Sequence, residues 1–411
     1  MMYRLISIIL IVAAVLIVLF SAKLLSDPNL DSFNLLPAIA SLYLGLAVAL
    51  PEKVLGSIGS SIRSNSRDDQ AKRRVVLRYL STVTRAILVV GLLWLAAEFS
   101  LRMWGHHRRV QYQRQGNLLF TPVPNQDYIE KISLTPSQIN NLGLRGPDVA
   151  DSDLEREVVL CLGDSITYGY GVEENQTYPS RLGQILEESS PGEFTVLNGG
   201  VNAYPMSFIH QKFLYLWETG VRPSLVVVSY SMNEGWLGHM VASDAREKDH
   251  FERRVHWKNM MRSLASYNLI VEKVGRVVYD KMKQRLVPGT HFTNLTEEEV
   301  GAQYQRVLAE MVEDMQARGV HVILLLPATW NKDTERYDSG GFLKDRFVKE
   351  ANMSGIPLLR AEELLTEGTK SAVIEKSLFL DGSHMSADGC NRVAEGLART
   401  IRNTQPGESN Y

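Results

Sequence analysis

Two short stretches of the sequence hold the residue types of a serine nucleophile and its activating groups. Ser165 follows an apolar run in GDSITYG, and Asp381 and His384 lie three residues apart in DGSHMSADG. A serine hydroxyl attacks well only when an imidazole accepts its proton and a carboxylate holds that imidazole in the right tautomer. Ser165 is therefore a candidate nucleophile, although a Gly-Asp-Ser turn alone is equally compatible with a structural role.

Attack on a carbonyl also requires hydrogen-bond donors where negative charge develops, and the loss of one such donor costs about 2.7 to 4 kcal/mol. The candidates are the backbone amides of Ser165 and Gly200 and the side-chain amide of Asn233. Each follows an apolar run that reads as a strand. Asp164, next to the serine, favours a turn and is expected to shape the loop.

The elements that must position these residues alternate between strand and helix. Short apolar runs predict strands at 158–164, 194–200, 224–231 and 320–327, with helices over 177–189, 206–218, 297–319, 342–353 and 387–401. Continuously apolar strands separated by helices predict a parallel sheet that is covered on both faces, with the site at the carboxyl ends of its strands.

A charged and aromatic insertion over 235–293 interrupts this alternation. It is compatible with solvated helices packed on the domain, with a lid or glycan-binding wall, and with contact to lipid headgroups. Its histidines lack the spacing of metal ligands, and Gly163, Gly169 and Gly171 lack the third glycine of a nucleotide-binding loop. No metal and no cofactor is predicted.

Four stretches together resemble the four blocks of the SGNH (GDSL-type) hydrolase family, in the family's order. They are GDSITYG, NGGVNAYP, SYSMNE and DGSHMSADG. The resemblance covers about 140–401 and implies a three-layer α/β/α, flavodoxin-like domain. It implies Ser165 as nucleophile, Asp381 and His384 as the rest of the triad, and Ser165, Gly200 and Asn233 as the oxyanion hole.

Two departures from the family's pattern affect the loops around the site. The third block reads Ser231-Met232-Asn233-Glu234 instead of Gly-x-Asn-Asp, which leaves the backbone path there open. The second block has Asn202 and Ala203 where a further glycine is common, so the loop is expected to lie tighter against substrate. The leader NNLGLRG is similar to what often precedes this domain in exported bacterial members.

The first hundred residues read as a membrane anchor with three spans, at about 5–22, 32–51 and 83–104. The third is the weakest because Arg85 and Glu98 lie within it, near its ends, where snorkelling reduces their cost. The sequence thus predicts an anchor over 1–104, a linker and leader over 105–150, and a hydrolase domain over 151–405.

Charge places the loop between spans two and three in the cytoplasm. It contains Lys53, Arg63 and five further basic residues up to Arg78. Three spans then put the catalytic domain outside the cytoplasmic membrane, in the periplasm of a cell with two membranes. Arg108, Arg109 and Arg114, just after span three, argue mildly against this. A third span that lies on the membrane surface would leave the domain in the cytoplasm.

Composition limits the partners. A net charge of -2, from 44 basic and 46 acidic residues, excludes a global field that would attract nucleic acid. The expected partners are the lipid bilayer and an acyl ester, with an envelope polysaccharide as one possible carrier. Cys161 and Cys390 lie in an apolar run and a predicted helix, and are expected to be buried free thiols rather than a disulfide.

These features favour a membrane-anchored serine esterase that acts through an acyl-enzyme, with an envelope glycan or similar acyl ester as substrate. Two alternatives stay open. One is an O-acyltransferase that uses the same triad but passes the acyl group to a sugar hydroxyl of an extracellular polysaccharide. The other is a non-catalytic glycan-binding or assembly factor, against which the presence of both Asp381 and His384 speaks.

Overall fold

The computed structural model describes residues 67–103, 109–116, 118–130, 133, 135–231, 233, 245–262, 264–270, 296–331, 335–338, 343–367 and 373–404. Two compact units divide the chain: Met1–Arg108 with Trp257–Arg285, and Arg109–His256 with Leu286–Tyr411. The second unit contains Ser165, Asp381 and His384. The spans predicted at 5–22 and 32–51 lie outside the described residues.

Five parallel strands form the sheet of the second unit, in the spatial order β11-β8-β7-β5-β6. Their bounds are β5 Glu157–Leu162, β6 Phe194–Asn198, β7 Leu225–Ser229, β8 His321–Leu326 and β11 Leu358–Arg360. Numbered along the chain, this is the order 2-1-3-4-5 of flavodoxin-like sheets, in which the order reverses between the first and third strands. The predicted α/β fold with a parallel sheet is confirmed.

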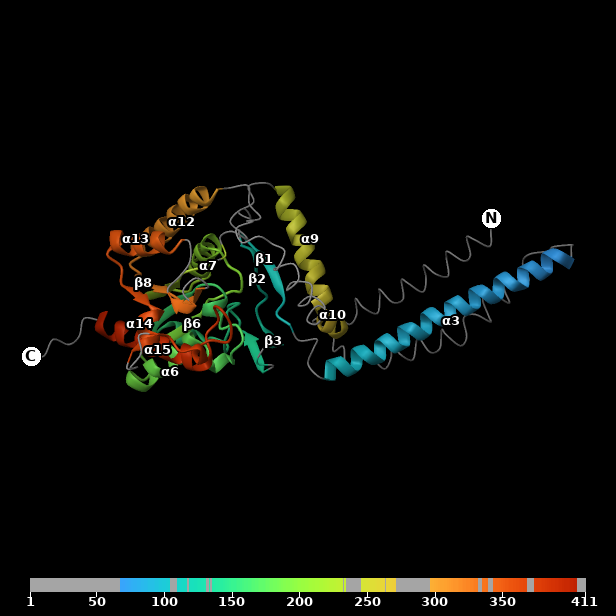
Figure 1. Cartoon of the computed structure of the whole chain (residues 1–411), viewed down its shortest axis with the longest axis horizontal. Coiled ribbons are helices and arrows are strands. Elements are labelled where there is room, and N and C mark those ends of the chain that lie inside the picture. Colours follow the sequence, from blue (N-terminus) through green and yellow to red (C-terminus); the bar gives the residue numbers. More distant parts are fainter. Residues whose placement is uncertain are drawn as a thin grey trace, which may run out of the picture. The chain divides into compact units, whose positions relative to one another are not determined.

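Helices cover both faces of this sheet (Figure 1). One face carries α7 Met206–Glu218, α12 Glu297–Ala317 and α13 Lys344–Ser354, and the other carries α6 Tyr178–Ser189, α14 Ala361–Thr366 and α15 Ala387–Thr404. Successive side chains of a strand point to opposite faces. Accordingly, Leu160 of β5 packs in the first core and Val159 and Cys161 in the second.

The predicted linker and leader over 105–150 contain four strands, for which the sequence analysis gave no expectation. They are β1 Tyr112–Gln115 paired with β2 Leu118–Pro122, and β3 Gln126–Ile129 paired with β4 Pro136–Ile139, both antiparallel. These strands have only four or five residues each, which is too short to show a clear apolar alternation. Tertiary contacts stabilise them instead: Leu118 and Ile139 are buried, and Tyr204 donates a hydrogen bond of 2.6 Å to the Phe120 carbonyl.

The remaining elements of the second unit are short and lie around the sheet. They are α4 Asp151–Leu154, α5 Ser165–Tyr168, η1 Glu174–Gln176, η3 Lys376–Leu378 and the hairpin of β9 Thr329–Asn331 with β10 Arg336–Asp338. Within the predicted insertion, the structure describes α9 Ala245–Arg262 and α10 Ala265–Ile270. Cys161 and Cys390 are buried free thiols, as predicted.

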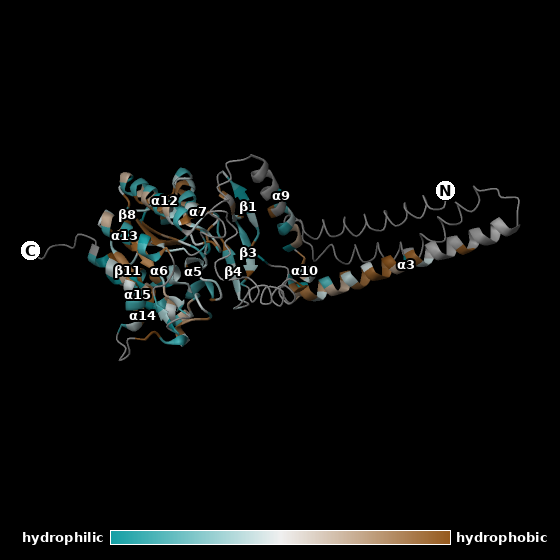
Figure 2. Ribbon diagram, turned by 45° about the horizontal axis from the view of Figure 1, so that its top comes forward, coloured by the Kyte–Doolittle hydropathy of each residue, from teal (hydrophilic) through white to brown (hydrophobic). Residues whose placement is uncertain are grey.

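In the first unit the described part is dominated by α3, a helix of 37 residues from Arg67 to Met103. Within it, Arg85–Met103 is long and apolar enough to cross a membrane, and it is the one such helix among the described residues. Figure 2 colours much of this stretch brown for high hydropathy. Large apolar side chains are exposed along it, namely Val89, Val90, Leu93, Phe99 and Met103.

Glu98, one of the three charged residues in this stretch, is fully buried rather than directed to the surface as predicted. Its carboxylate accepts hydrogen bonds from the backbone amides of Ala265, at 2.7 Å, and Ser266, at 2.9 Å. Arg102 donates a third from Nε at 2.9 Å. The cost of this charge is therefore offset by pairing and by capping of α10, not by snorkelling.

Candidate active site

The turn after β5 presents Ser165 at the carboxyl edge of the sheet. Asp164 caps the short helix α5, because its Oδ1 accepts a hydrogen bond of 3.0 Å from the Ile166 amide. Glycine is required at position 163, since a Cβ there would lie 2.1 Å from Thr167 Oγ1. Ser165 is the first residue of α5 and is half-buried. The predicted role of Asp164 in shaping the turn is confirmed.

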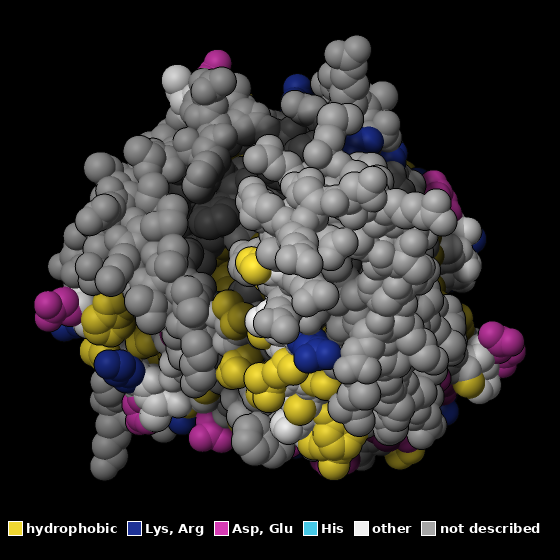
Figure 3. All heavy atoms as spheres, turned by 90° about the vertical axis from the view of Figure 1, so that its right-hand side faces the viewer, with side chains coloured by type: hydrophobic (Ala, Val, Ile, Leu, Met, Phe, Trp, Pro, Cys, Tyr) yellow, Lys and Arg dark blue, Asp and Glu magenta, His cyan; other side chains and the backbone are white. Residues whose placement is uncertain are grey.

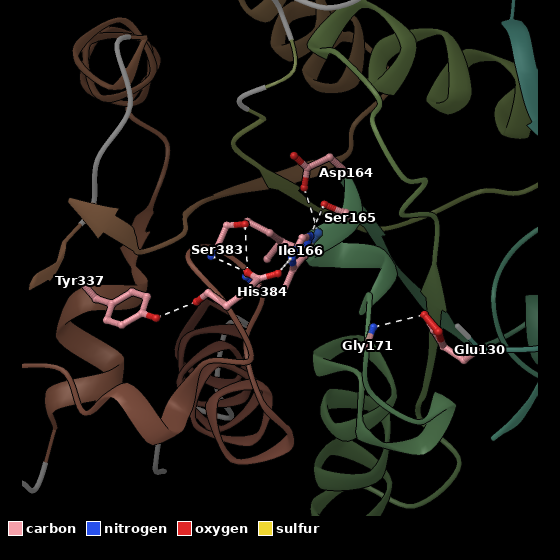
Figure 4. A network of polar contacts seen from close by, with 9 residues as sticks. Glu130, Asp164, Ser165, Ile166, Gly171, Tyr337, Ser383 and His384 are labelled. Carbon is pink, nitrogen blue, oxygen red and sulfur yellow. Dashed lines mark hydrogen bonds and ion pairs between the residues drawn. The ribbon is translucent and has the colours of Figure 1, made fainter. Parts of the chain in front are cut away.

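The loop before α15 carries Asp381 and His384. His384 Nδ1 lies 2.8 Å from Asp381 Oδ2, while Asp381 Oδ1 accepts hydrogen bonds from the backbone amides of Ser383, at 2.8 Å, and His384, at 2.9 Å. On the opposite side of the ring, His384 Nε2 lies 2.9 Å from Ser165 Oγ. Figure 4 shows His384 and Ser165 next to each other, although they come from elements far apart in the sequence.

This geometry requires one tautomer. With the proton on Nδ1, the imidazole donates to Asp381 and its Nε2 accepts the Ser165 hydroxyl proton. Partial burial acts to raise the pKa of Asp381, but hydrogen bonds from the His384 side chain and from the backbone amides of His384 and Ser383 outweigh it and hold the pKa well below its usual range. Asp381 therefore stays ionised and keeps the ring in the orientation that a base for Ser165 needs.

The Asp381–His384 loop is held by the β9–β10 hairpin and the chain next to it. Tyr337 donates a hydrogen bond of 2.6 Å to the Asp381 carbonyl and stacks on Phe379, with ring centroids 3.8 Å apart. The Trp330 amide donates to the Gly382 carbonyl at 2.7 Å. Sequence reasoning did not identify this hairpin, because its strands have only three residues each.

Asn233, after β7, lies on the other side of the turn. Its Nδ2 donates to Asp164 Oδ2 at 2.8 Å and lies 3.2 Å from Ser231 Oγ and 3.4 Å from the Tyr204 carbonyl. Asp164 thus does more than shape the turn, because it also fixes the amide that the sequence predicted as an oxyanion donor. Ser231 replaces the usual glycine of this block and contacts that same amide.

Gly200 lies in the loop after β6, but its amide already has a partner. It donates to Asn198 Oδ1 at 3.1 Å, and the residue packs so closely on α5 that a Cβ would lie 2.2 Å from the Tyr168 nitrogen. The glycine therefore allows this loop to pack closely against α5, whereas we had expected it to allow the backbone to approach the substrate closely. The prediction that the Gly200 amide stabilises an oxyanion stays a prediction.

Ala203, which sequence reasoning noted only as a departure from glycine, is the exposed residue of the same loop. Its φ of 64° lies in the left-handed region, which non-glycine residues rarely adopt. Within the described part of the chain, the backbone amides of Ala203 and Ser165 have no hydrogen-bond partner. The sequence did carry one indication of this conformation, because Ala203 stands where a further glycine is common in the family.

A further aromatic contact on the histidine was also missed. The ring of Tyr170, two residues after the end of α5, lies with its centroid 4.8 Å from that of His384, at an interplanar angle of 49°. Tyr170 is half-buried. No spacing rule links this tyrosine to His384, because the contact depends on the path of the turn.

Comparison with known proteins agrees with this architecture. Residues 161–372, just over half of the chain, match the sequence model of the GDSL-like Lipase/Acylhydrolase family. The match begins inside β5 and ends before Asp381, so the placement of Asp381 and His384 next to Ser165 is independent of it. No match was found among curated proteins.

Solved structures of esterases share low sequence identity with the chain. An acetylxylan esterase from Geobacillus stearothermophilus is 17% identical, with a TM-score of 0.34, over 60% of this chain and 94% of that one. A psychrotrophic esterase from Pseudoalteromonas sp. is 12% identical, with a TM-score of 0.36, over 60% and 97%. A lipolytic protein of the G-D-S-L family from Veillonella parvula is 13% identical, with a TM-score of 0.36, over 60% and 98%.

Proposed function

The chain belongs to the GDSL-like lipase/acylhydrolase family and is a serine ester hydrolase, and we propose that it acts from a membrane anchor on an acyl ester through an acyl-enzyme at Ser165. One observation carries the proposal. His384 Nε2 is 2.9 Å from Ser165 Oγ while its Nδ1 is 2.8 Å from Asp381. This is the chain of contacts that activates a serine hydroxyl.

In the first half-reaction, Ser165 Oγ attacks the ester carbonyl as His384 Nε2 takes the hydroxyl proton. The tetrahedral intermediate collapses, the C–O bond to the leaving alcohol breaks, and the imidazolium returns its proton to that alcohol. In the second half-reaction, water attacks the acyl-enzyme while His384 again takes and returns a proton. Asp381 stays ionised throughout and stabilises the imidazolium.

The oxyanion requires donors on the side of Ser165 that faces away from His384. The Ser165 amide and the Asn233 side chain serve in this proposal as the sequence predicted. For the loop after β6, we assign the role to the Ala203 amide in place of Gly200, because the Gly200 hydrogen is committed to Asn198. The left-handed φ of 64° at Ala203 is the kind of backbone strain that clusters at functional sites.

The anchor rests on α3 and on charge. The apolar stretch Arg85–Met103 exposes Val89, Val90 and Leu93, by 49%, 64% and 66%, which suits contact with lipid tails. Figure 3 shows yellow apolar side chains among its coloured atoms. The basic residues that precede this apolar stretch in the sequence include five in the first part of α3 itself, from Arg67 to Arg78. With that end of the helix in the cytoplasm, the hydrolase unit lies outside the cytoplasmic membrane.

An extracytoplasmic anchored esterase meets acylated envelope components, so an acyl ester on an envelope glycan is the substrate class that we propose. Topology alone supports this choice.

Hydrolysis of a short acyl ester by the purified full-length protein tests the catalytic proposal. We expect Ser165→Ala to reduce kcat/KM by at least about 10⁴-fold, since a serine hydrolase without its nucleophile retains little more than binding and oxyanion stabilisation. Gln184→Ala, on the exposed side of α6, is the control and should keep the wild-type rate. A Ser165→Ala variant with the wild-type rate would refute the proposal.

Topology requires a separate experiment in intact cells. A membrane-impermeant fluorophosphonate should label wild-type protein, but not Ser165→Ala, before lysis. Labelling that occurs only after lysis would place the hydrolase unit in the cytoplasm and overturn the proposed orientation, while leaving the catalytic proposal intact.

A further inference from the structure

Arg145, from the leader that precedes β5, is buried against the turn that follows the nucleophile. Only 3% of it is exposed. Its Nη1 donates to the carbonyls of Tyr168, at 2.8 Å, and Gly169, at 2.7 Å, and its Nη2 donates to that of Val172 at 2.9 Å. The guanidinium carbon also lies 4.7 Å from the centre of the Tyr168 ring.

These carbonyls belong to the end of α5 and the loop after it, and a helix end leaves such groups without intrahelical partners. A planar guanidinium with five N–H donors can serve three carbonyls at once, which an ammonium on a flexible stem cannot do in the same geometry. In the described part of the chain, no carboxylate lies within ion-pair distance of Arg145. Burial of this charge is costly. In the described part of the chain, the guanidinium donates only to these three carbonyls and, from Nε at 3.3 Å, to the Ser137 hydroxyl.

Other leader residues hold the same turn from both sides. Glu130, which is buried, accepts a hydrogen bond of 3.3 Å from the Gly171 amide (Figure 4). Glu174 accepts hydrogen bonds of 2.9 Å from both the Ser137 hydroxyl and the Gln138 amide. Arg145, Glu130 and strand β4 therefore fix the loop Tyr168–Glu174 at its beginning, middle and end, respectively.

The residue carried at the middle of this loop is Tyr170, whose ring packs on His384 with a centroid separation of 4.8 Å. An aromatic ring against an imidazole limits its rotation, and the ring face also favours the imidazolium that forms during catalysis. Arg145 also contacts the loop after β6. Its backbone forms an antiparallel bridge with Asn198, whose Oδ1 accepts the hydrogen bond from the Gly200 amide.

From this chain of contacts we propose that Arg145 is a positioning residue for the esterase reaction: it locks the Tyr168–Val172 turn so that Tyr170 holds His384 in line with Ser165. The inference rests on the proposed function, because it concerns the same histidine. It assigns to the leader, which lies outside residues 161–372 of the family match, a part in the active centre.

The test compares full-length variants by kcat per active site, with sites counted by fluorophosphonate titration. Arg145→Lys keeps the positive charge but removes the planar guanidinium that donates to three carbonyls. It should lower kcat per titrated site about 10- to 100-fold and change KM less than about twofold, as expected for misplacement of a catalytic group. Tyr170→Ala should give a similar loss, and Tyr170→Phe should keep the wild-type rate. Arg156→Gln, at a surface ion pair with Asp153, is the matched control and should behave as wild type.

A double-mutant cycle distinguishes a positioning role of Arg145 from a purely structural role. If Arg145 acts through Tyr170, the Arg145→Lys/Tyr170→Ala double variant should be no slower per site than the slower single variant. Unchanged kcat per titrated site in Arg145→Lys, with fewer titratable sites, would show a folding role only and overturn the proposal. Should Arg145→Lys fail to fold, an unchanged kcat per site in Tyr170→Ala would also overturn it. Failure of the wild-type protein to react with the titrant would instead refute the proposed function.

Discussion

The two sides of the Ser165 hydroxyl differ in which part of the chain makes their contacts. On the imidazole side, side chains make them: His384 Nε2 is 2.9 Å from Ser165 Oγ, and Asp381 is 2.8 Å from Nδ1. On the donor side, the Asn233 NH₂ group gives one of its two hydrogens to Asp164 at 2.8 Å, and its other contacts, with Ser231 and Tyr204, are longer, at 3.2 and 3.4 Å. The amides without a partner among the described residues belong to the backbone of Ser165 and Ala203.

The difference indicates that the residues of proton transfer are already in place before substrate binds. On the donor side, the amide hydrogens of Ser165 and Ala203 stay available for the oxyanion that forms only during the reaction. Donors aimed at a developing oxyanion contribute most when they need not reorganise. Side-chain substitutions on the imidazole side should therefore lower kcat strongly. On the donor side, a substitution should lower kcat strongly only where the side chain itself is the hydrogen-bond donor.

The largest effect is expected at Asp381. Replacement by Asn keeps the shape but removes the charge and allows His384 to adopt the wrong tautomer, so kcat should fall by about 10⁴-fold. Steady-state kinetics on a short acyl ester measure this. A fall of less than about tenfold would show that the Asp381–His384 contact does not orient the base.

Asn233→Ala should cost about 10²- to 10³-fold in kcat, the effect of removing one oxyanion donor. Because its Nδ2 also contacts Asp164, Asp164→Asn serves as the comparison, and we expect a smaller loss there, since the cap on α5 can still accept a hydrogen bond. An Asn233→Ala variant with wild-type kcat would remove the side-chain amide from the donor set.

A smaller effect, on stability, separates the two candidate amides of the loop after β6. Gly200→Ala forces a Cβ to within 2.2 Å of the Tyr168 nitrogen and should destabilise the fold by about 1 to 3 kcal/mol, the usual cost of overpacking. Ala203→Gly should leave kcat within about threefold and the melting temperature unchanged or higher, since glycine adopts positive φ without strain. Thermal unfolding in detergent tests both, and equal stability of the two variants would contradict the packing described for Gly200.

The smallest expected effect is the response of stability to acid. The pKa of Asp381 is held below its usual range in the folded protein, chiefly by His384 and Ser383 against the opposing effect of burial. Its stabilising contribution is thus present above about pH 4 and is lost as the pH falls toward the folded-state value. Because its side chain is 47% exposed, solvent screening keeps the gain below about 1 kcal/mol. The free energy of unfolding of Asp381→Asn should fall less steeply below pH 4 than that of the wild type, and equal slopes would contradict the shift.

The same comparison explains how far the sequence could predict the site. Apolar runs predicted four of the five strands of the parallel sheet, and the motif blocks predicted Asp381 and His384 on the imidazole side. What the sequence missed depends on backbone path: the short strands of the leader, the turn that brings Tyr170 to His384, and the left-handed Ala203. Arg145 was visible as a motif residue, but its contacts with Tyr168, Gly169 and Val172 are to carbonyls, and carbonyls carry no sequence signature.

Trapping of the acyl-enzyme tests the central claim most directly. Full-length protein mixed with an excess of a p-nitrophenyl acyl ester is quenched in acid during turnover, digested and measured by mass spectrometry. The account predicts that the acyl group is attached to Ser165, and that Ser165→Ala shows neither adduct nor burst of nitrophenol. An adduct on another residue, or turnover by wild-type protein with no adduct on Ser165 at any quench time and no burst, would contradict it.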